Sequence, residues 1–190
     1  MRAANFQHSK TLRKPIADSL ISIVLPVFNE QEVLPLLLQA VEDSLQSAGC
    51  GYEIIFVNDG SSDHSGQILD DLAELNSRVR VLHFAKNFGH QAAVQAGLLH
   101  TTGDAVVIMD SDMQDSPTAI VDFIEQWQAG YDVVYAIRTD RKENFVKRWA
   151  FQTFHKTLNL IASTSIPRDA GNFGLIDRKV AIQIAQLNDR

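Results

Sequence analysis

Short apolar segments alternate with segments of helical periodicity along this chain, and this alternation restricts the possible folds more than any other feature of the sequence. The apolar segments have the length and the β-branched or aromatic content of single strands, at residues 21–27, 52–57, 79–84, 104–109, 131–136 and 173–176. The helical segments stand between and after them, at residues 33–45, 68–75, 91–100, 118–128, 144–162 and 178–187. This order predicts the α/β class, with a mainly parallel sheet that carries helices on both faces.

The length of the chain and its first residues predict one domain preceded by an arm. A chain of 190 residues has the size of a single domain with a substantial core. Residues 1–19 are polar and basic and contain no apolar run, so we expect a poorly ordered arm and no signal peptide. Residues 20–190 are expected to form the domain. No apolar run reaches the ~18 residues of a transmembrane helix.

Charge and cysteine content limit the possible functions. The formal net charge of −6 argues against general nucleic-acid binding, because such proteins carry basic surfaces. Cys50 is the single cysteine, so the chain cannot form an internal disulfide, and this composition is typical of a reducing compartment.

Polar clusters follow five of the predicted strands. They occupy residues 28–30, 58–61, 86–89, 110–112 and 138–141. In open α/β sheets, ligands bind beyond the carboxyl ends of the strands. The sequence therefore predicts one binding site at this edge of the sheet. The glycine-rich fingerprint of dinucleotide-binding proteins is absent, which argues against a dehydrogenase of that class.

Two aspartates, Asp110 and Asp112, are separated by a single residue where the fourth predicted strand ends. The chain bends at such a point, and both carboxylates can then turn toward one hard cation. Mg²⁺ or Mn²⁺ prefers oxygen ligands and is often completed by substrate phosphates. A solvated acidic turn would have the same sequence, so the motif alone leaves both interpretations open.

Three ordered segments of the chain resemble glycosyltransferase family 2: Leu-Pro-Val-Phe-Asn-Glu at 25–30, Val-Asn-Asp-Gly-Ser-Ser-Asp at 57–63, and Asp-Ser-Asp-Met-Gln-Asp-Ser-Pro at 110–117. The segment Lys-Asn-Phe-Gly-His-Gln at 86–91 resembles the polyprenyl-phosphate branch of that family, with its bactoprenol glucosyltransferases and dolichol-phosphate mannose synthases. The resemblance extends over residues 20–187. It implies the A-type glycosyltransferase fold and an inverting, metal-dependent enzyme. Such an enzyme transfers a sugar from a nucleoside-diphosphate sugar to a polyprenyl phosphate at the cytoplasmic face of a membrane.

The resemblance also implies which residues bind the donor. These are Pro26, Glu30, Asp59, Asn87, Gly89, Asp110 and Gln114. It implies that Asp112 is a catalytic residue and the direct ligand of Mg²⁺ or Mn²⁺, and that Asp110 lies near the metal or the ribose.

Several of these residues have a second interpretation. Glu30 could instead begin a helix, since acids favour helix N-termini. Asp59, which could accept a hydrogen bond from a nucleobase N–H, could also belong to an ordinary Asp-Gly turn. Asn87 and Gly89 could equally form a structural turn. His90 follows that turn, where polar side chains often contact ligands, although packing is the more common role of a histidine.

A basic cluster after the fifth predicted strand corresponds to the acceptor side of the family. By resemblance, Arg138, Arg141 and Lys147 would contact phosphate oxygens, and arginine is well suited to bidentate phosphate recognition. Lys147 could instead belong to a solvated helix face. The helix predicted at 144–162 mixes aromatic and basic residues, which fits either a membrane surface or ordinary core packing. The expected partners are therefore a nucleotide sugar, a polyprenyl phosphate, the membrane surface, and either a second copy or a membrane partner subunit.

The chain departs from the family in two places. Where bacterial glucosyltransferases of the family have Gly-Asp-Phe-Arg-Leu, residues 171–175 read Gly-Asn-Phe-Gly-Leu. The amide of Asn172 cannot act as a general base. Mannose synthases of the family also carry an aspartate three residues earlier, so the resemblance implies that Asp169 is the second catalytic carboxylate, at the metal or at the acceptor site. Members of this branch also often continue into transmembrane helices, and residues 20–190 are expected to be a catalytic domain without that part. The sequence leaves open whether this is a soluble domain, a short form that docks on membranes, or a shortened chain.

These departures keep other functions open. The chain could be a nucleotide-sugar sensor or an inactive partner subunit, or it could transfer sugar to a growing polysaccharide. The sequence distinguishes neither the sugar nor the nucleotide, although the resemblance favours UDP. The resemblance also implies a cytoplasmic protein that is peripheral to the inner face of the membrane.

Overall fold

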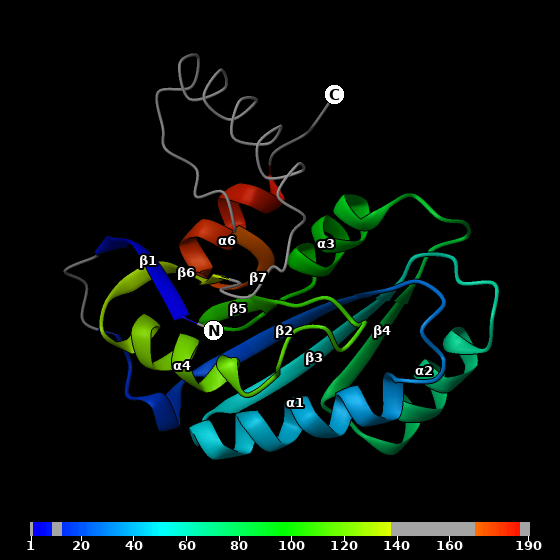
Figure 1. The fold of residues 1–190 in the computed structure, drawn as a ribbon, viewed down its shortest axis with the longest axis horizontal. Helices are drawn as coiled ribbons and strands as arrows, with labels where there is room; N and C mark the ends of the chain where they lie inside the picture. The colour runs from blue at the N-terminus through cyan, green and yellow to red at the C-terminus, as the bar shows by residue number, and fades with distance from the viewer. Residues whose placement is uncertain (1, 9–12, 138–169, 187–190) are drawn as a thin grey trace, which may run out of the picture.

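The structure is a computed structural model of the chain and describes residues 2–8, 13–137 and 170–186 (Figure 1). The strands within these residues are β1 (Arg2–His8), β2 (Leu20–Val27), β3 (Gly51–Asn58), β4 (Val79–His83), β5 (Ala105–Ile108), β6 (Tyr131–Ile137) and β7 (Ala170–Asp177). The helices are α1 (Leu34–Ala48), α2 (Ser65–Leu75), α3 (His90–Leu99), α4 (Ala119–Gln128) and α6 (Arg178–Ala185), with a 3-10 turn at Ile16–Asp18.

The described strands form one sheet in the order β1-β6-β7-β5-β2-β3-β4. The pairs of β2 with β3, β2 with β5 and β3 with β4 are parallel, whereas β7 is antiparallel to both β5 and β6, and β1 is antiparallel to β6. Five of the seven strands, β2 to β6, therefore run in one direction. The prediction of a mainly parallel α/β sheet is confirmed.

Helices cover both faces of this sheet, as predicted (Figure 1). Alternate residues of β2 divide between two cores because successive side chains of a strand point to opposite faces. Ile23 and Leu25 pack with residues of α1, α2 and α4, whereas Val24 packs with Leu98 of α3 and Ala181 of α6. Since both faces are covered, β2 reads as a continuous apolar run rather than an alternating one.

The N-terminal segment differs from the prediction of a poorly ordered arm. Residues 2–8 form β1, which pairs with β6 at the edge of the sheet. The pairing uses backbone N–H and C=O groups, so a segment without an apolar pattern can form it, and sequence periodicity carries no signal for it. The expectation of an arm without regular structure was therefore wrong for these residues.

Arg13, which also belongs to the predicted arm, forms ion pairs with the body of the domain. Its guanidinium lies 3.0 Å from Asp132 Oδ1 and 2.8 Å from Asp177 Oδ2, and it stacks 4.5 Å from the ring centre of Trp127. The side chains of Arg13 and Asp132 are each only 7% exposed. Burial is the largest influence on the guanidinium and lowers the pKa of Arg13, while both aspartates act against that shift. This ion pair therefore joins the N-terminal segment to the start of β6 and the end of β7.

Two further statements concern helices. The helix expected at 144–162 lies outside the described residues. Within the described part of the chain, no helix combines the length and apolar character that crossing a membrane requires.

Candidate functional site

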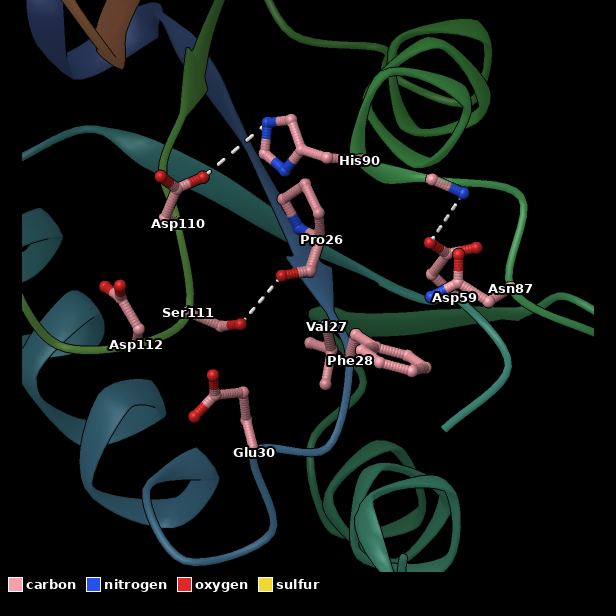
Figure 2. Close-up of a pocket in the computed structure, with 11 residues that line it drawn as sticks. Pro26, Val27, Phe28, Glu30, Asp59, Asn87, His90, Asp110, Ser111 and Asp112 are labelled. Atoms are coloured by element: carbon pink, nitrogen blue, oxygen red, sulfur yellow. Dashed lines mark hydrogen bonds and ion pairs between the residues drawn. The ribbon is translucent and has the colours of Figure 1, made fainter. Parts of the chain in front are cut away.

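A pocket of about 290 Å³ lies at the carboxyl ends of the central parallel strands (Figure 2). It is lined by Pro26, Val27, Phe28, Glu30, Asp59, Asn87, Gly89, His90, Asp110, Ser111 and Asp112. These residues come from the ends of β2, β3 and β5 and from the loop between β4 and α3. Parallel strands bring their carboxyl ends to one edge of the sheet, which explains why segments more than 80 residues apart meet here.

The pocket collects six of the seven predicted donor-binding residues. Pro26, Glu30, Asp59, Asn87, Gly89 and Asp110 line it, together with the predicted metal ligand Asp112. Gln114 is exposed and is not among the lining residues. The structure thus places these residues around one cavity, while their roles stay predictions.

Asp59 is buried and holds the loop that forms one wall of the pocket. Its Oδ1 accepts a hydrogen bond of 2.7 Å from the backbone N–H of Phe88, and its Oδ2 accepts one of 2.9 Å from that of Gly89. Each carboxylate oxygen can accept more than one hydrogen bond, so a nucleobase N–H could still bind here. Asp59 therefore has a structural contact that the sequence did not indicate.

Gly60 lets the loop after β3 approach the loop between β4 and α3. Its φ is +67°, and a Cβ atom at this position would lie 2.3 Å from the carbonyl carbon of Lys86 and 2.6 Å from the nitrogen of Asn87. Backbone at that distance leaves no space for a side chain. The glycine of the Asp-Gly sequence is thus required by the close approach of the backbone, and the aspartate lines the pocket.

A second network fixes the loop that carries Glu30. The backbone N–H of Glu30 donates to Ser65 Oγ at 2.9 Å, and that of Asn29 donates to Ser61 Oγ at 3.0 Å. Asn29 Oδ1 in turn accepts a 2.8 Å hydrogen bond from the N–H of Ser62. Glu30 lies before α1, which begins at Leu34. The structure therefore does not support the alternative that Glu30 begins the helix.

Ser111 anchors the segment between the two aspartates. It is buried, and its Oγ donates a 2.7 Å hydrogen bond to the carbonyl oxygen of Pro26. Asp112 is exposed, and its Oδ1 accepts a 3.0 Å hydrogen bond from the backbone N–H of Gln114. Met113, which stands between Asp112 and Gln114, has a φ of +59°, and this marks the sharp bend of the chain. This bend follows the strand, so Asp110 and Asp112 both reach the pocket.

The charge of the pocket favours a cation. Burial raises the pKa of Glu30, and the negative charges of Asp112 and Asp63 raise it further. After burial, the negative charges of Asp112 and Asp63 thus contribute to the raised pKa of Glu30, and the same charges would attract a cation. The described residues contain no cluster of three or more histidine, cysteine or acidic side chains able to hold a metal ion. Mg²⁺ commonly takes one or two carboxylates and completes its shell with substrate phosphates and water, which this site could provide.

Sequence comparison identifies the family. The model of glycosyl transferase family 2 matches residues 22–185. The chain belongs to glycosyltransferase family 2. This match includes every strand end that contributes to the pocket, and it confirms the resemblance drawn from residues 25–30, 57–63 and 110–117.

Relatives with known names support this assignment. The chain is 41% identical over 170 residues to the uncharacterized glycosyltransferase YkcC of Bacillus subtilis, covering 89% of this chain and 53% of that protein. It is 42% identical over 171 residues to the bactoprenol glucosyl transferase of Shigella phage SfX, covering 90% and 56%. The chain therefore spans about half the length of the curated relatives it matches.

The solved glucosyl-3-phosphoglycerate synthase of Mycobacterium tuberculosis, in complex with Mn²⁺, UDP and phosphoglyceric acid, has a similar fold. It superposes with a TM-score of 0.59 at 20% identity, covering 86% of this chain and 57% of that one. The likeness confirms the A-type glycosyltransferase fold of this family 2 chain.

The acceptor-side residues predicted for this family 2 chain cannot be placed. Arg138, Arg141, Lys147 and Asp169 lie outside the described residues, and the side chain of Asn172 is not described. Gly174 is described, and a Cβ atom there would lie 2.6 Å from the carbonyl oxygen of Val134. The sheet is therefore closed around a glycine where bacterial glucosyltransferases of the family carry arginine, and a side chain would require β6 to shift.

Two polar residues of the pocket, Ser111 and His90, were not among the site residues expected from the sequence. Ser111 lies between the two aspartates, and its small hydroxyl was a signal for a structural hydrogen bond. His90 follows the Asn-Phe-Gly turn, and the position of that turn before a helix was the only signal for its place in the pocket. Neither contact could be derived from spacing, since both partners come from other segments.

Glu30→Gln is expected to raise the melting temperature of this family 2 chain near neutral pH, by about 1–2 °C. The raised pKa means that the folded state disfavours the Glu30 carboxylate. The wild-type chain is therefore destabilised once pH rises above the unfolded-state pKa, and the neutral amide removes that effect. Scanning calorimetry near pH 7.5 and near pH 4 measures it, since the carboxyl is largely protonated at the lower value. An equal shift at both pH values would contradict the charge explanation.

Should Asp59 bind the nucleobase of UDP, as the sequence predicts, Asp59→Asn would weaken UDP binding by about 1.5–3 kcal/mol, the range for hydrogen bonds to charged groups. The amide keeps one acceptor but turns an N–H donor toward the N–H of Phe88 or Gly89. The loop wall should therefore shift, and the melting temperature should fall as well. Calorimetric titration with UDP and a thermal scan measure both quantities. Unchanged UDP affinity with a large thermal shift would limit Asp59 to a structural role.

Proposed function

We propose that this chain is the donor-binding and catalytic part of a glycosyltransferase that moves a sugar from a UDP-sugar to a polyprenyl phosphate. The observation that carries the proposal is the convergence of Asp59, Asp110 and Asp112 on one pocket at the carboxyl edge of the sheet. The name of the relative from Shigella phage SfX, at 42% identity, supports a polyprenyl acceptor and a glucosyl donor. The UDP and Mn²⁺ of the structural neighbour support the nucleotide and a divalent metal.

The residues of the pocket would divide the donor between them. The nucleobase would lie against the Asp59 wall, between the end of β3 and the loop at 87–89. The diphosphate would lie toward Asp110 and Asp112, which would hold Mg²⁺ or Mn²⁺ together with its phosphate oxygens. When bound, this cation would neutralise charge on the leaving diphosphate. Holding both ends of the donor orients the anomeric carbon toward the acceptor.

The reaction would be a single displacement with inversion. An acceptor phosphate oxygen forms a bond to the anomeric carbon while the bond from that carbon to the diphosphate breaks, and UDP leaves. A phosphate monoester is largely ionised near neutral pH, so little proton abstraction is needed. The change from acid to amide at Asn172 is therefore compatible with turnover. Asp169 remains our proposed acceptor-side carboxylate, and Arg138, Arg141 and Lys147 our proposed phosphate-binding residues.

A donor panel tests the proposal. The full chain is incubated with Mn²⁺, undecaprenyl phosphate in detergent, and UDP-glucose, UDP-N-acetylglucosamine or GDP-mannose in separate reactions. Both released nucleotide and glycolipid are measured, and proton NMR of the glycolipid gives the anomeric configuration. We expect UDP release matched by a glycolipid of inverted configuration. Retained configuration would overturn the inverting mechanism.

The proposed sensor or inactive subunit is the second candidate, because Asn172 and Gly174 replace the acid and the arginine of the family pattern. A sensor would bind the UDP-sugar in the same pocket without forming a glycolipid. Binding by calorimetry without product in the panel would move that function to first place. Product on a polysaccharide acceptor in place of the lipid would favour the third alternative. The membrane-surface location is part of the proposal and is tested by sedimentation with vesicles that contain undecaprenyl phosphate.

A further inference from the structure

His90 is a polar pocket residue to which the proposed function gives no role. It is the first residue of α3, and its ring lines the pocket. Its Nε2 lies 3.6 Å from Asp110 Oδ1, and Figure 2 shows the imidazole turned toward that carboxylate. About one third of each side chain is exposed, 36% for His90 and 30% for Asp110. The pair therefore lies at the wall of the cavity and not in the core.

The position of His90 is determined by its neighbour Gly89. Gly89 has a φ of +95°, a conformation that favours glycine, and it precedes the helix directly. Its N–H donates to Asp59 Oδ2 at 2.9 Å. Asp59, on the proposed nucleobase side of the pocket, thus holds the residue that directly precedes His90.

The body of α3 gives His90 a rigid base. Ala93, one turn into the helix, is buried in a cluster with Ile55 and Val57 of β3. Gly97 packs so closely on β2 that a Cβ atom there would lie 2.3 Å from Val24 Cγ1. The helix therefore lies directly against the sheet at this point. A side chain on its first residue keeps a fixed place relative to the strand ends.

We propose that His90 is a positioning residue that orients the Asp110 carboxylate, and that it couples nucleotide binding to divalent-cation binding. This inference rests on the proposed function, in which Asp110 faces the cation. The physical path consists of three contacts: Asp59 holds Gly89, Gly89 sets the place of His90, and His90 faces Asp110. Because these contacts hold His90 in place, they would also hold the Asp110 carboxylate in an orientation that favours a cation shared with the nucleotide.

The expected effect follows from the behaviour of groups that orient metal ligands. Removing such a partner typically lowers metal affinity by 10- to 100-fold. We expect His90→Ala to reduce the enhancement of UDP affinity by Mn²⁺ by about 10-fold or more. UDP affinity in EDTA should stay within about twofold, because the Asp59 wall is unchanged. His90→Gln places an amide N–H at a similar reach and should recover part of the enhancement.

The experiment is a calorimetric titration of the full chain with UDP, in MnCl₂ and in EDTA. Free Mn²⁺ measured by electron paramagnetic resonance provides a second readout that does not depend on turnover. His100→Ala is the matched control, because His100 is exposed at the other end of α3 and its Nδ1 contacts the carbonyl oxygen of Ala96. This control should keep the full Mn²⁺ enhancement.

Each outcome separates the inference from the proposed function. If the unaltered chain binds UDP more tightly with Mn²⁺ and His90→Ala keeps that difference, the inference is wrong and the donor site stands. Equal weakening of UDP binding in MnCl₂ and in EDTA would make His90 a direct nucleotide contact or a structural residue, and would also overturn it. Failure of the unaltered chain to bind UDP would overturn the proposed donor site and this inference with it.

Discussion

Asp112→Ala is expected to lower turnover by at least about 100-fold and to make UDP affinity nearly insensitive to Mn²⁺. The carboxylate lies in the pocket, next to the bend at Met113, where it would hold the cation against the diphosphate. In the proposed function, losing it would remove both a ligand and a negative charge that offsets the cation. The cost is comparable to that of losing one strong electrostatic contact in an active site.

Calorimetric titration of UDP with and without Mn²⁺ measures the binding effect, and glycolipid formation measures turnover. Asp71→Ala is the control, since this aspartate is exposed on α2 and is not among the pocket residues. The Asp112 variant should also have a slightly lower melting temperature, because the hydrogen bond that Asp112 accepts from the N–H of Gln114 contributes about 1 kcal/mol. If Mn²⁺ strengthens UDP binding by the same factor in the variant, Asp112 is not the metal ligand.

Arg13→Ala is expected to lower the free energy of unfolding by about 3 kcal/mol, near the lower end for breaking a buried ion pair. The substitution leaves Asp132 and Asp177 without their shared guanidinium. Lys179 Nζ, 2.8 Å from Asp132 Oδ1, compensates part of this loss. In a domain of this length, the melting temperature should fall by about 6–12 °C.

Lys14→Ala provides a control from the adjacent residue. Lys14 Nζ lies 2.7 Å from Asp104 Oδ1, a shorter contact than that of Arg13 with Asp132, but its side chain is 62% exposed. Exposed pairs contribute about 0–1 kcal/mol, so this variant should unfold close to the wild type. Similar destabilisation by both substitutions, measured by urea denaturation, would show that burial does not decide the strength of these pairs.

Part of the candidate site could be predicted because its signals are local. Asp110 and Asp112 follow an apolar run, and Asp59 follows another, so each reads as a polar residue at a strand end. One topological rule, that parallel strands end at the same edge, then brings them together. The pocket contains both groups, as that rule requires.

The contacts within the site could not be predicted, because each joins segments far apart in the chain. Asp59 binds the N–H groups of Phe88 and Gly89, and Ser111 binds the carbonyl oxygen of Pro26, 85 residues earlier. A buried carboxylate has the same sequence signature whether it accepts hydrogen bonds from a ligand or from a neighbouring loop. Only the packing of the loops distinguishes the two.

Patterns in the amino-acid sequence were sufficient to predict the α/β class, the two-sided helical cover and four strand ends that contribute to the pocket, because hydrophobic periodicity and strand-end polarity are properties of short segments. The fifth predicted strand end, at 138–141, lies outside the described residues. Three features became visible only in the folded domain: residues 2–8 pair with β6, Arg13 is buried between Asp132 and Asp177, and His90 faces Asp110. Backbone pairing at a sheet edge requires no particular side chains, and an ion pair over more than 100 residues leaves no periodic trace. Both depend on where the folded chain brings distant segments together.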